Sequence, residues 1–121
     1  FDVVAGVDAR GFILAGAAAQ LSHTGLIPVR KKGKLSRPAH SIDYDLEYGT
    51  ATLEIQDDVP AGSRVLLIDD VLATGGTLSA AATLLGRLGL ETVGVAVLFE
   101  IAELQGRNNL GDLPLHTVFQ G

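Results

Sequence analysis

The stretch from Val65 to Thr77, VLLIDDVLATGGT, limits the possible folds of this 121-residue chain more than any other stretch. It begins with four apolar residues, as expected of a strand buried on both faces of a sheet. Asp69 and Asp70 follow at the predicted end of that strand, and a small glycine-containing loop from Ala73 to Thr77 then opens a helix. This order of strand, acidic pair, loop and helix predicts an α/β fold with a mainly parallel sheet.

The rest of the chain continues the alternation of strands and helices. Buried strands are predicted at residues 2–7, 26–29, 64–68, 92–99 and 116–119, and helices at 12–21 and 77–88. The helical spacing of the first helix predicts that its sheet-facing side consists of Leu14, Ala17, Ala18 and Leu21. Residues 50–56 alternate between apolar and polar and are expected to form a hairpin with 41–48, whereas 35–45 lack clear periodicity and predict a long loop. We therefore expect one domain, residues 1–121, with a twisted sheet flanked by helices.

Composition excludes several classes of protein. With 9 Lys and Arg against 14 Asp and Glu, the net charge is −5, which argues against binding to nucleic acid or to an anionic membrane. The chain has no Cys, so disulfides and thiolate chemistry are ruled out. The apolar run from Gly11 to Leu21 is too short to span a bilayer, and we expect a cytoplasmic protein. Because the chain starts at Phe1 inside an apolar stretch, we also expect that a natural N-terminal segment is missing.

The acidic pair and the loop after it suggest a sugar phosphate as ligand. Two adjacent carboxylates, Asp69 and Asp70, can accept hydrogen bonds from vicinal hydroxyls or reach a hydrated cation. The N–H groups of a helix start suit a phosphate, and Thr74 and Thr77 add hydroxyl donors. A Walker loop is excluded because no Lys follows the glycines, and no G-x-G-x-x-G is present. Ribose 5-phosphate fits both features, although each half alone also occurs in ordinary strand–turn–helix units. The predicted 5′-phosphate site is Ala73, Thr74, Gly75, Gly76 and Thr77.

The whole run resembles the phosphoribosyl-pyrophosphate signature of type I phosphoribosyltransferases. Four further segments are similar to the adenine phosphoribosyltransferase family in order and spacing: Val7–Phe12 (VDARGF), Arg30–Leu35 (RKKGKL), Leu46–Thr50 (LEYGT) and Leu104–Arg107 (LQGR). The resemblance covers nearly the whole chain, but the N-terminal segment of the family, with much of the hood over the base, has no counterpart. At residue 8 this chain has Asp, where the family more often has Glu.

The resemblance implies a role for each matching residue. It implies a flexible hairpin lid at about residues 35–50, and a loop at residues 8–11 of a kind that often contains a non-proline cis peptide. Asp69 and Asp70 would bind the ribose and reach a metal ion only through substrate or water, and Arg107 would make a structural contact. The residues implied to meet the pyrophosphate are Ala9, Arg10, Gly11, Arg30, Lys31 and Lys34. The implied catalytic residues, near the purine, are Glu47 and Tyr48.

The implied reaction is the transfer of the phosphoribosyl group from phosphoribosyl pyrophosphate to adenine, giving AMP and pyrophosphate, with Mg²⁺ as cofactor. A homodimer is expected from the resemblance, and because the basic residues 30–34 have no obvious acidic partner within the chain. The sequence leaves open a different base specificity, a non-catalytic regulator that binds phosphoribosyl pyrophosphate, and a truncated form without turnover. His23, His40 and His116 lack ligand spacing and are expected to be structural or exposed.

Overall fold

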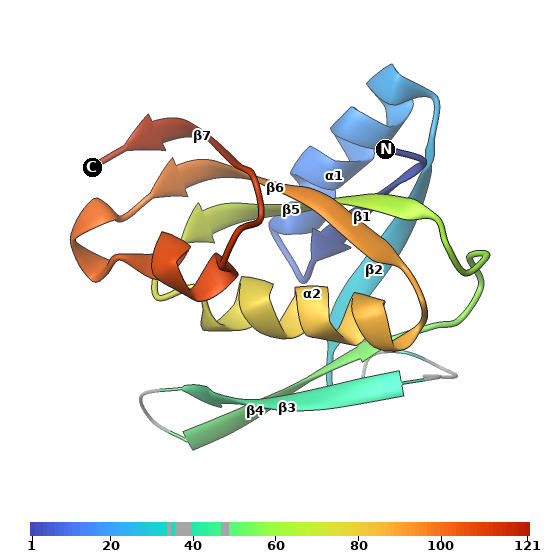
Figure 1. Cartoon of the computed structure of the whole chain (residues 1–121), viewed down its shortest axis with the longest axis horizontal. Helices are drawn as coiled ribbons and strands as arrows, with labels where there is room; N and C mark the ends of the chain where they lie inside the picture. Colours follow the sequence, from blue (N-terminus) through green and yellow to red (C-terminus); the bar gives the residue numbers. More distant parts are fainter. Residues whose placement is uncertain (34, 36–39, 47–48) are drawn as a thin grey trace.

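A computed structural model of the chain describes residues 1–33, 35, 40–46 and 49–121, and within these residues it forms one seven-stranded sheet (Figure 1). Helix α1 (Gly11–Ser22) packs on one face of the sheet and α2 (Gly76–Arg87) on the other. The strands are β1 (Val3–Val7), β2 (Gly25–Lys31), β3 (His40–Leu46), β4 (Gly49–Ile55), β5 (Arg64–Leu72), β6 (Glu91–Glu100) and β7 (Leu115–Gln120). Two short 3₁₀ turns, η1 (Ala102–Leu104) and η2 (Gly106–Leu110), connect β6 to β7. The predicted α/β fold is confirmed.

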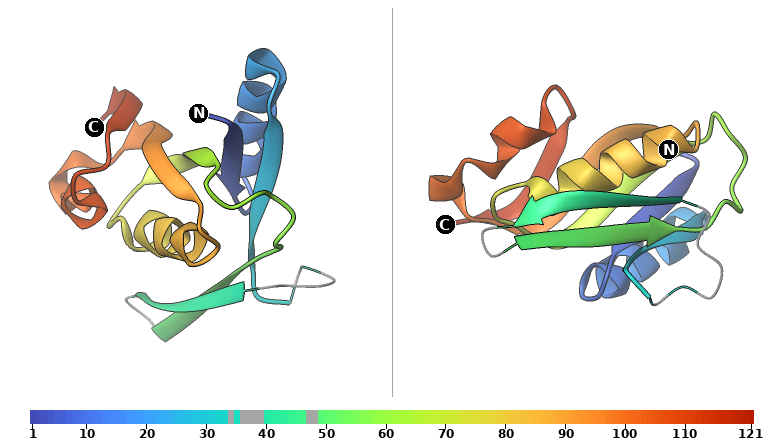
Figure 2. Two further views of the ribbon diagram at one scale, coloured as in Figure 1. Left: turned by 45° about the vertical axis from the view of Figure 1, so that its right-hand side comes forward. Right: turned by 90° about the horizontal axis from the view of Figure 1, so that it is seen from below.

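The sheet has a parallel centre and an antiparallel edge, in the order β3-β4-β2-β1-β5-β6-β7. Strand β1 is buried along its whole length and lies parallel to β2 and β5. The β3–β4 hairpin joins the sheet where β4 pairs antiparallel with the end of β2, and it lies along α2 (Figure 2). No helix in the described part of the chain is both long and apolar enough to cross a membrane.

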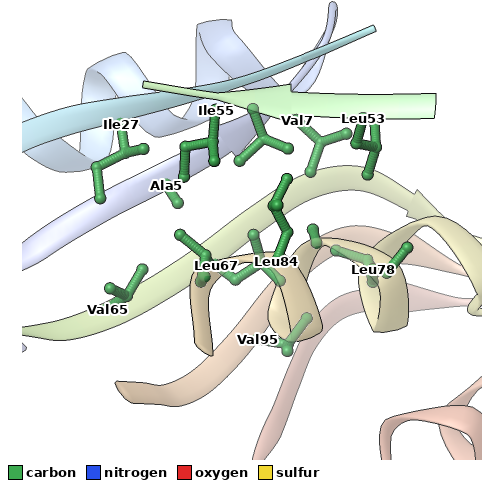
Figure 3. Packing of buried hydrophobic residues seen from close by; sticks show 14 of the residues in the cluster. Ala5, Val7, Ile27, Leu53, Ile55, Val65, Leu67, Leu78, Leu84 and Val95 are labelled. Carbon is green, nitrogen blue, oxygen red and sulfur yellow. The ribbon is translucent and has the colours of Figure 1, made fainter. Parts of the chain in front are cut away.

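The larger apolar core lies between the sheet and α2 (Figure 3). Ala5, Val7 and Leu67 from the central strands meet Leu78 and Leu84 from α2, all of them almost completely buried. The hairpin closes the side of this core with two further buried side chains, Leu53 and Ile55. Because both faces of the central strands are covered, their carboxyl ends are held firmly in place, which matters for the site described below.

The helix at residues 12–21 is confirmed as α1, but its predicted sheet-facing side is wrong for two of the four residues, Ala17 and Leu21. The buried residues of α1 are Gly11, Ala15 and Ala19, with Leu14 and Ala18 only partly buried beside them. Ala17 is exposed, and Leu21 is 83% exposed. The reason is a close approach of helix and strand: a Cβ on Gly6 of β1 would lie 2.6 Å from the Cβ of Ala15. Only small side chains fit at this distance, so Leu14 packs at the edge of the contact and Leu21 lies in solvent.

Strand β5 is longer than predicted and includes the acidic pair. It runs to Leu72, because β6 continues beside it with Asp69 opposite Val97 and Leu72 opposite Glu100. Asp69 and Asp70 therefore lie within a paired strand and not after its end. Pairing with a neighbouring strand holds their backbone more rigidly than a loop would.

The predicted hairpin is confirmed, although the predicted loop at 35–45 is wrong in its second half. Strand β3 starts at His40 and pairs with β4 from His40 opposite Ile55 to Leu46 opposite Gly49. Ile42 and Tyr44 pack against the core, an alternation that was present in the sequence but was hidden between polar residues. Glu54, one of the polar residues of the alternating segment, is buried, and the backbone N–H of Gly33 donates a 2.8 Å hydrogen bond to its carboxylate.

Candidate active site

An open pocket of about 490 Å³ lies at the carboxyl ends of β1 and β5. In a parallel sheet this edge is where ligands usually bind. The loop after β1, the end of β2 and the acidic pair of β5 all line this pocket, with Ala9, Arg10, Lys31, Asp69 and Asp70 among the lining residues. A smaller hollow of about 80 Å³, formed by residues 71–78 and Asp69, adjoins it and shares Asp69, Val71, Ala73 and Thr77 with it.

The loop after β1 lies directly against the acidic pair. Its Asp8–Ala9 peptide bond is cis, as the resemblance implied. A Cβ on Gly11 would lie 3.0 Å from Oδ1 of Asp69, so only glycine lets the start of α1 approach so closely. The Nε of Arg10 lies 2.7 Å from Oδ2 of Asp70, while the Arg10 side chain stays 78% exposed. The arrangement presents an exposed cation and a tight backbone turn to the same pocket.

The basic residues of β2 are divided between two environments. Neighbouring residues on a strand point to opposite faces. Lys31 lines the pocket, whereas the Nε of Arg30 lies 3.6 Å from Oδ2 of Asp8, and its guanidinium stacks 5.5 Å from the ring centre of Phe12. The carboxylate of Asp8 also accepts a hydrogen bond from the backbone N–H of Lys31. The expectation that this basic cluster has no acidic partner within the chain is therefore wrong. Lys34 lies outside the described residues.

The two carboxylates of the acidic pair differ in their electrostatics. Partial burial raises the pKa of Asp69 to about 7, and the neighbouring Asp70 adds to the rise. The backbone N–H of Asp70, 2.8 Å from Oδ1 of Asp69, and the charge of Arg10 act in the opposite direction. Near neutral pH, Asp69 therefore exchanges between its protonated and ionised forms. Asp70 instead accepts a hydrogen bond from the N–H of Val71 and faces Arg10.

This raised pKa predicts a stability difference that depends on pH. Between the ordinary pKa of 3.8 and about 7, the folded chain keeps a proton on Asp69 that the unfolded chain has lost. Stability therefore falls as pH rises through this range. We expect Asp69→Asn to match the wild type near pH 4 and to unfold at a higher temperature at pH 8. The gain should be about 1–2 kcal/mol once solvent screening of the partly exposed carboxyl is allowed for. Thermal melts of both proteins across this pH range, with exposed Asp57→Asn as control, measure it; parallel pH profiles would contradict it.

The loop from Ala73 to Thr77 has the features expected of an anion site. Helix α2 starts at Gly76, and Gly75 before it has a φ of +87°, which glycine adopts readily. Within the described part of the chain, the backbone N–H groups of residues 74–77 donate no hydrogen bond. The hydroxyl of Thr77 donates to the hydroxyl of Tyr44 at 3.4 Å, which brings β3 beside this loop. Free N–H groups at a helix start, next to a small hollow, are able to bind a phosphate.

Sequence reasoning missed three residues that shape the site: Asp8 as the buried partner of Arg30, Tyr44 of β3, and Asn109 of η2, whose side-chain amide donates to the carbonyl of Thr74. Each of these residues contacts a partner that is far away in the sequence, so no local motif predicts the contact. The predicted structural role of Arg107 holds: its guanidinium donates two hydrogen bonds to buried Glu100, at 2.8 and 2.5 Å. This pairing also lowers the pKa of Glu100. Glu47 and Tyr48, the implied catalytic residues, lie outside the described residues.

The fold and the pocket together define the class of protein. At one edge the parallel sheet carries an acidic pair, a glycine-containing loop that opens α2, and the turn that contains Arg10. A family model described as "Phosphoribosyl transferase domain" matches residues 1–113, and the chain belongs to this family.

Similar proteins point to one branch of the family. The chain is 63% identical over 111 residues to the adenine phosphoribosyltransferase of Arthrobacter sp. (strain FB24), a match that covers 91% of this chain and 60% of that protein. For the enzyme of Mycolicibacterium paratuberculosis the identity is 54% over 119 residues, covering 97% and 66%. The chain thus spans about three fifths to two thirds of the length of these relatives.

Solved structures of adenine phosphoribosyltransferases have the same fold. The enzyme of Rhodothermus marinus matches with a TM-score of 0.96 and 48% identity, over 100% of this chain and 70% of that one. The enzyme of Saccharomyces cerevisiae, solved with an imino-altritol bisphosphate and adenine, matches with a TM-score of 0.93 and 36% identity, over 98% and 67%. The type I phosphoribosyltransferase-like fold is confirmed.

Proposed function

We propose that this chain is the core of an adenine phosphoribosyltransferase, which transfers the phosphoribosyl group of phosphoribosyl pyrophosphate to adenine and releases pyrophosphate. The observation that carries the proposal is the meeting, in two adjoining pockets, of three groups: the acidic pair, the turn around Arg10, and the 73–77 loop, whose N–H groups at 74–77 donate no hydrogen bond to any described residue. These groups match the diol, the 5′-phosphate and the pyrophosphate of that substrate. The named relatives support adenine as the base.

The site residues take the following roles in this proposal. Residues 73–77 bind the 5′-phosphate, and Asp69 and Asp70 accept hydrogen bonds from the ribose hydroxyls. Lys31 and Arg10, with the backbone of residues 9–11, meet the pyrophosphate, and Lys34 joins them. Arg30 contributes positive charge next to these residues and helps to hold the turn in place, because it lies beside Asp8 and Phe12. Glu47 and Tyr48 act near the purine, and the hairpin around them forms the lid.

For a transfer of this kind the protein has to position the substrates and stabilise charge, and it forms no covalent bond with them. The bond between the anomeric carbon and the pyrophosphate oxygen breaks as the bond to the purine nitrogen forms, through a loose, cationic transition state. Rigid strands that hold the ribose and phosphate groups in place supply much of the rate. A lid is needed because water competes with the purine for the activated sugar. The contact between Tyr44 and Thr77 is evidence that the lid lies beside the loop at residues 73–77, which we call the phosphate loop.

We also propose Mg²⁺ as the cofactor, bound mainly through substrate and water. Among the described residues there is no cluster of three or more potential metal ligands, and Asp70 already faces Arg10. Two adjacent carboxylates fit an ion that keeps several waters and few protein ligands. When bound, Mg²⁺ would offset the negative charge of the leaving pyrophosphate. The protein would contribute Asp69 and Asp70 as acceptors for the water and ribose hydroxyls around the ion.

A homodimer and a cytoplasmic location complete the proposal. The homodimer now rests on the family resemblance alone, since Arg30 has an acidic partner within its own chain. Sedimentation of the purified chain at micromolar concentration tests it, and a monomer there would contradict it.

Calorimetry and turnover assays test the proposed function directly. We expect the chain to bind phosphoribosyl pyrophosphate in the presence of Mg²⁺ and to form AMP from adenine but not GMP from guanine. Turnover with another base only would favour a different base specificity. Tight binding with no turnover on any base would favour a binding protein or an inactive core. Absence of binding would refute the proposal.

We expect Glu47→Gln to reduce kcat by about 10²-fold or more, because a positioned carboxyl that shares a proton with the purine contributes on this scale. Affinity for phosphoribosyl pyrophosphate should change little, since its phosphates bind elsewhere in the pocket. Steady-state kinetics measure both quantities, with exposed Glu103→Gln as the matched control. A kcat within about twofold of the wild type, less than roughly 0.5 kcal/mol of barrier, would leave Glu47 without a chemical role.

A further inference from the structure

We propose that Asn109 is a positioning residue that orients the Thr74–Gly75 peptide and so directs the N–H of Gly75 at the bound 5′-phosphate. The inference rests on the proposed function, because it concerns the same phosphate loop. Asn109 belongs to η2, far from the loop in sequence, and does not line either pocket at the acidic pair.

The phosphate loop and η2 touch through their backbones. A Cβ on Gly75 would collide with the carbonyl oxygen of Gly106, and a Cβ on Gly106 would collide with the carbonyl oxygen of Ala73. Two glycines thus allow the two segments to lie closer than any side chain would permit. The outer side of the loop is therefore covered by η2, while its inner side faces the small hollow.

One side-chain hydrogen bond joins the two segments at this contact. The Nδ2 of Asn109 donates to the carbonyl oxygen of Thr74 at 2.5 Å. That carbonyl belongs to the same planar peptide unit as the N–H of Gly75. Among the described residues, the only cis peptide is Asp8–Ala9, so the Thr74–Gly75 peptide is trans and its C=O and N–H point in opposite directions. With the carbonyl held toward η2, the N–H of Gly75 points away from η2.

The direction of this N–H matters for anion binding. Gly75 has a φ of +87°, and glycine adopts positive and negative φ about equally well, so the residue type alone does not fix the orientation of the peptide before it. If this peptide flipped, the loop would present a carbonyl oxygen to the phosphate in place of a donor, which repels an anion. Asn109 provides the restraint, and the N–H of Gly75 then joins those of Gly76 and Thr77 on one side of the loop.

The position of Asn109 is itself well supported. Its neighbour Arg107 forms the double hydrogen bond with buried Glu100, and Leu110 at the end of η2 is 5% exposed. The amide of Asn109 therefore starts from a turn that is anchored at both ends, and it can hold the loop without help from the ligand.

Binding of two different ligands to purified variants tests the inference. Calorimetry with ribose 5-phosphate reports on the phosphate loop, and calorimetry with pyrophosphate reports on the turn around Arg10. We expect Asn109→Asp, which keeps the size but replaces the donor by a repelling oxygen, to bind ribose 5-phosphate roughly tenfold more weakly. Asn109→Ala, which adds no charge, should bind it about threefold to fivefold more weakly. Pyrophosphate affinity and melting temperature should stay close to those of the wild type.

The neighbouring Asn108→Ala is the matched control, because Asn108 lies on the same turn and its exposed side chain makes no hydrogen bond within the described part of the chain. It should leave both affinities unchanged. If Asn109→Asp and Asn109→Ala bind ribose 5-phosphate as the wild type does, the inference is wrong. An equal loss of affinity for both ligands would also overturn it, because Asn109 would then stabilise the whole site and not the phosphate loop in particular. If the wild type itself binds no ribose 5-phosphate, the proposed function fails and the inference falls with it.

Discussion

Replacing Asp69 and Asp70 together by Asn should weaken binding of phosphoribosyl pyrophosphate by roughly 10²–10³-fold while the chain stays folded. Hydrogen bonds from hydroxyls to a carboxylate contribute more than those between neutral groups, and the loss of two charged acceptors amounts to about 3–4 kcal/mol. Folding should lose little. The Arg10–Asp70 pair is largely exposed on the Arg10 side, and such pairs contribute about 1 kcal/mol or less. Asp69 is partly buried, so its neutral replacement removes an unfavourable charge above pH 7.

Calorimetry with phosphoribosyl pyrophosphate and Mg²⁺, together with thermal melts, measures both effects. The chain offers a matched control in Asp57 and Asp58, a second adjacent acidic pair, which is exposed in the segment after β4. Replacing that pair by Asn makes the same change in net charge and should leave affinity unchanged. A large drop in melting temperature with affinity intact would assign Asp69 and Asp70 to the structure and not to the site.

The second large effect is expected from Gly106→Ala. A Cβ at this buried position would collide with the carbonyl oxygen of Ala73 and lie 3.0 Å from Cδ1 of Leu72. Both neighbours belong to the end of β5 and the start of the phosphate loop, so relief of the collision must move that loop. We expect a loss of about 2–4 kcal/mol in the free energy of unfolding, and a loss of ribose 5-phosphate binding in the fraction that remains folded.

Gly86→Ala is the control for this substitution. Gly86 lies in α2 with no atom within 4 Å of a Cβ placed on it, and alanine favours the helix. This variant should therefore gain about 0.5–1 kcal/mol and keep its ligand affinity. Thermal melts and ribose 5-phosphate titrations on the two variants make the comparison. Equal melting temperatures for Gly106→Ala and the wild type would contradict the prediction. They would mean that η2 can shift to accommodate the Cβ at little cost, and that its close contact with the loop does not stabilise the fold.

Much of the architecture follows from local patterns that can be read along the chain. Apolar runs of strand length, such as residues 65–68, and helical spacings such as that in residues 77–88 reflect how each segment buries its own side chains. The motif from Asp69 to Thr77 is equally local, because the acidic pair, the glycines and the threonines that form the pocket edge are nearly consecutive. The strand–loop–helix unit was therefore predictable before any contact between distant segments was known, and the same motif is the source of the proposal of a sugar phosphate as ligand.

Predictions failed where two segments had to meet. The sheet-facing side of α1 depends on how closely Ala15 approaches Gly6, and helical spacing alone favoured the larger leucines. The length of β5 depends on β6, which continues beside it past Asp69. The rise of the Asp69 pKa to about 7 likewise results mainly from burial, which the residues next to Asp69 in the sequence do not predict.

The order of strands and helices, the loop at residues 73–77 and the position of the acidic pair follow from local sequence, because they arise from short-range periodicity and from backbone conformations that particular residues favour. Which distant residues support that site depends instead on how the elements pack in three dimensions. Asp8 beside Arg30, Tyr44 beside Thr77 and Asn109 on the carbonyl of Thr74 are separated by 22 to 35 positions, and each pair is joined by sheet pairing or by packing of a turn against a loop. Hydrogen bonds of this kind depend on distances of a few tenths of an ångström, which the packed core sets and a residue pattern does not contain.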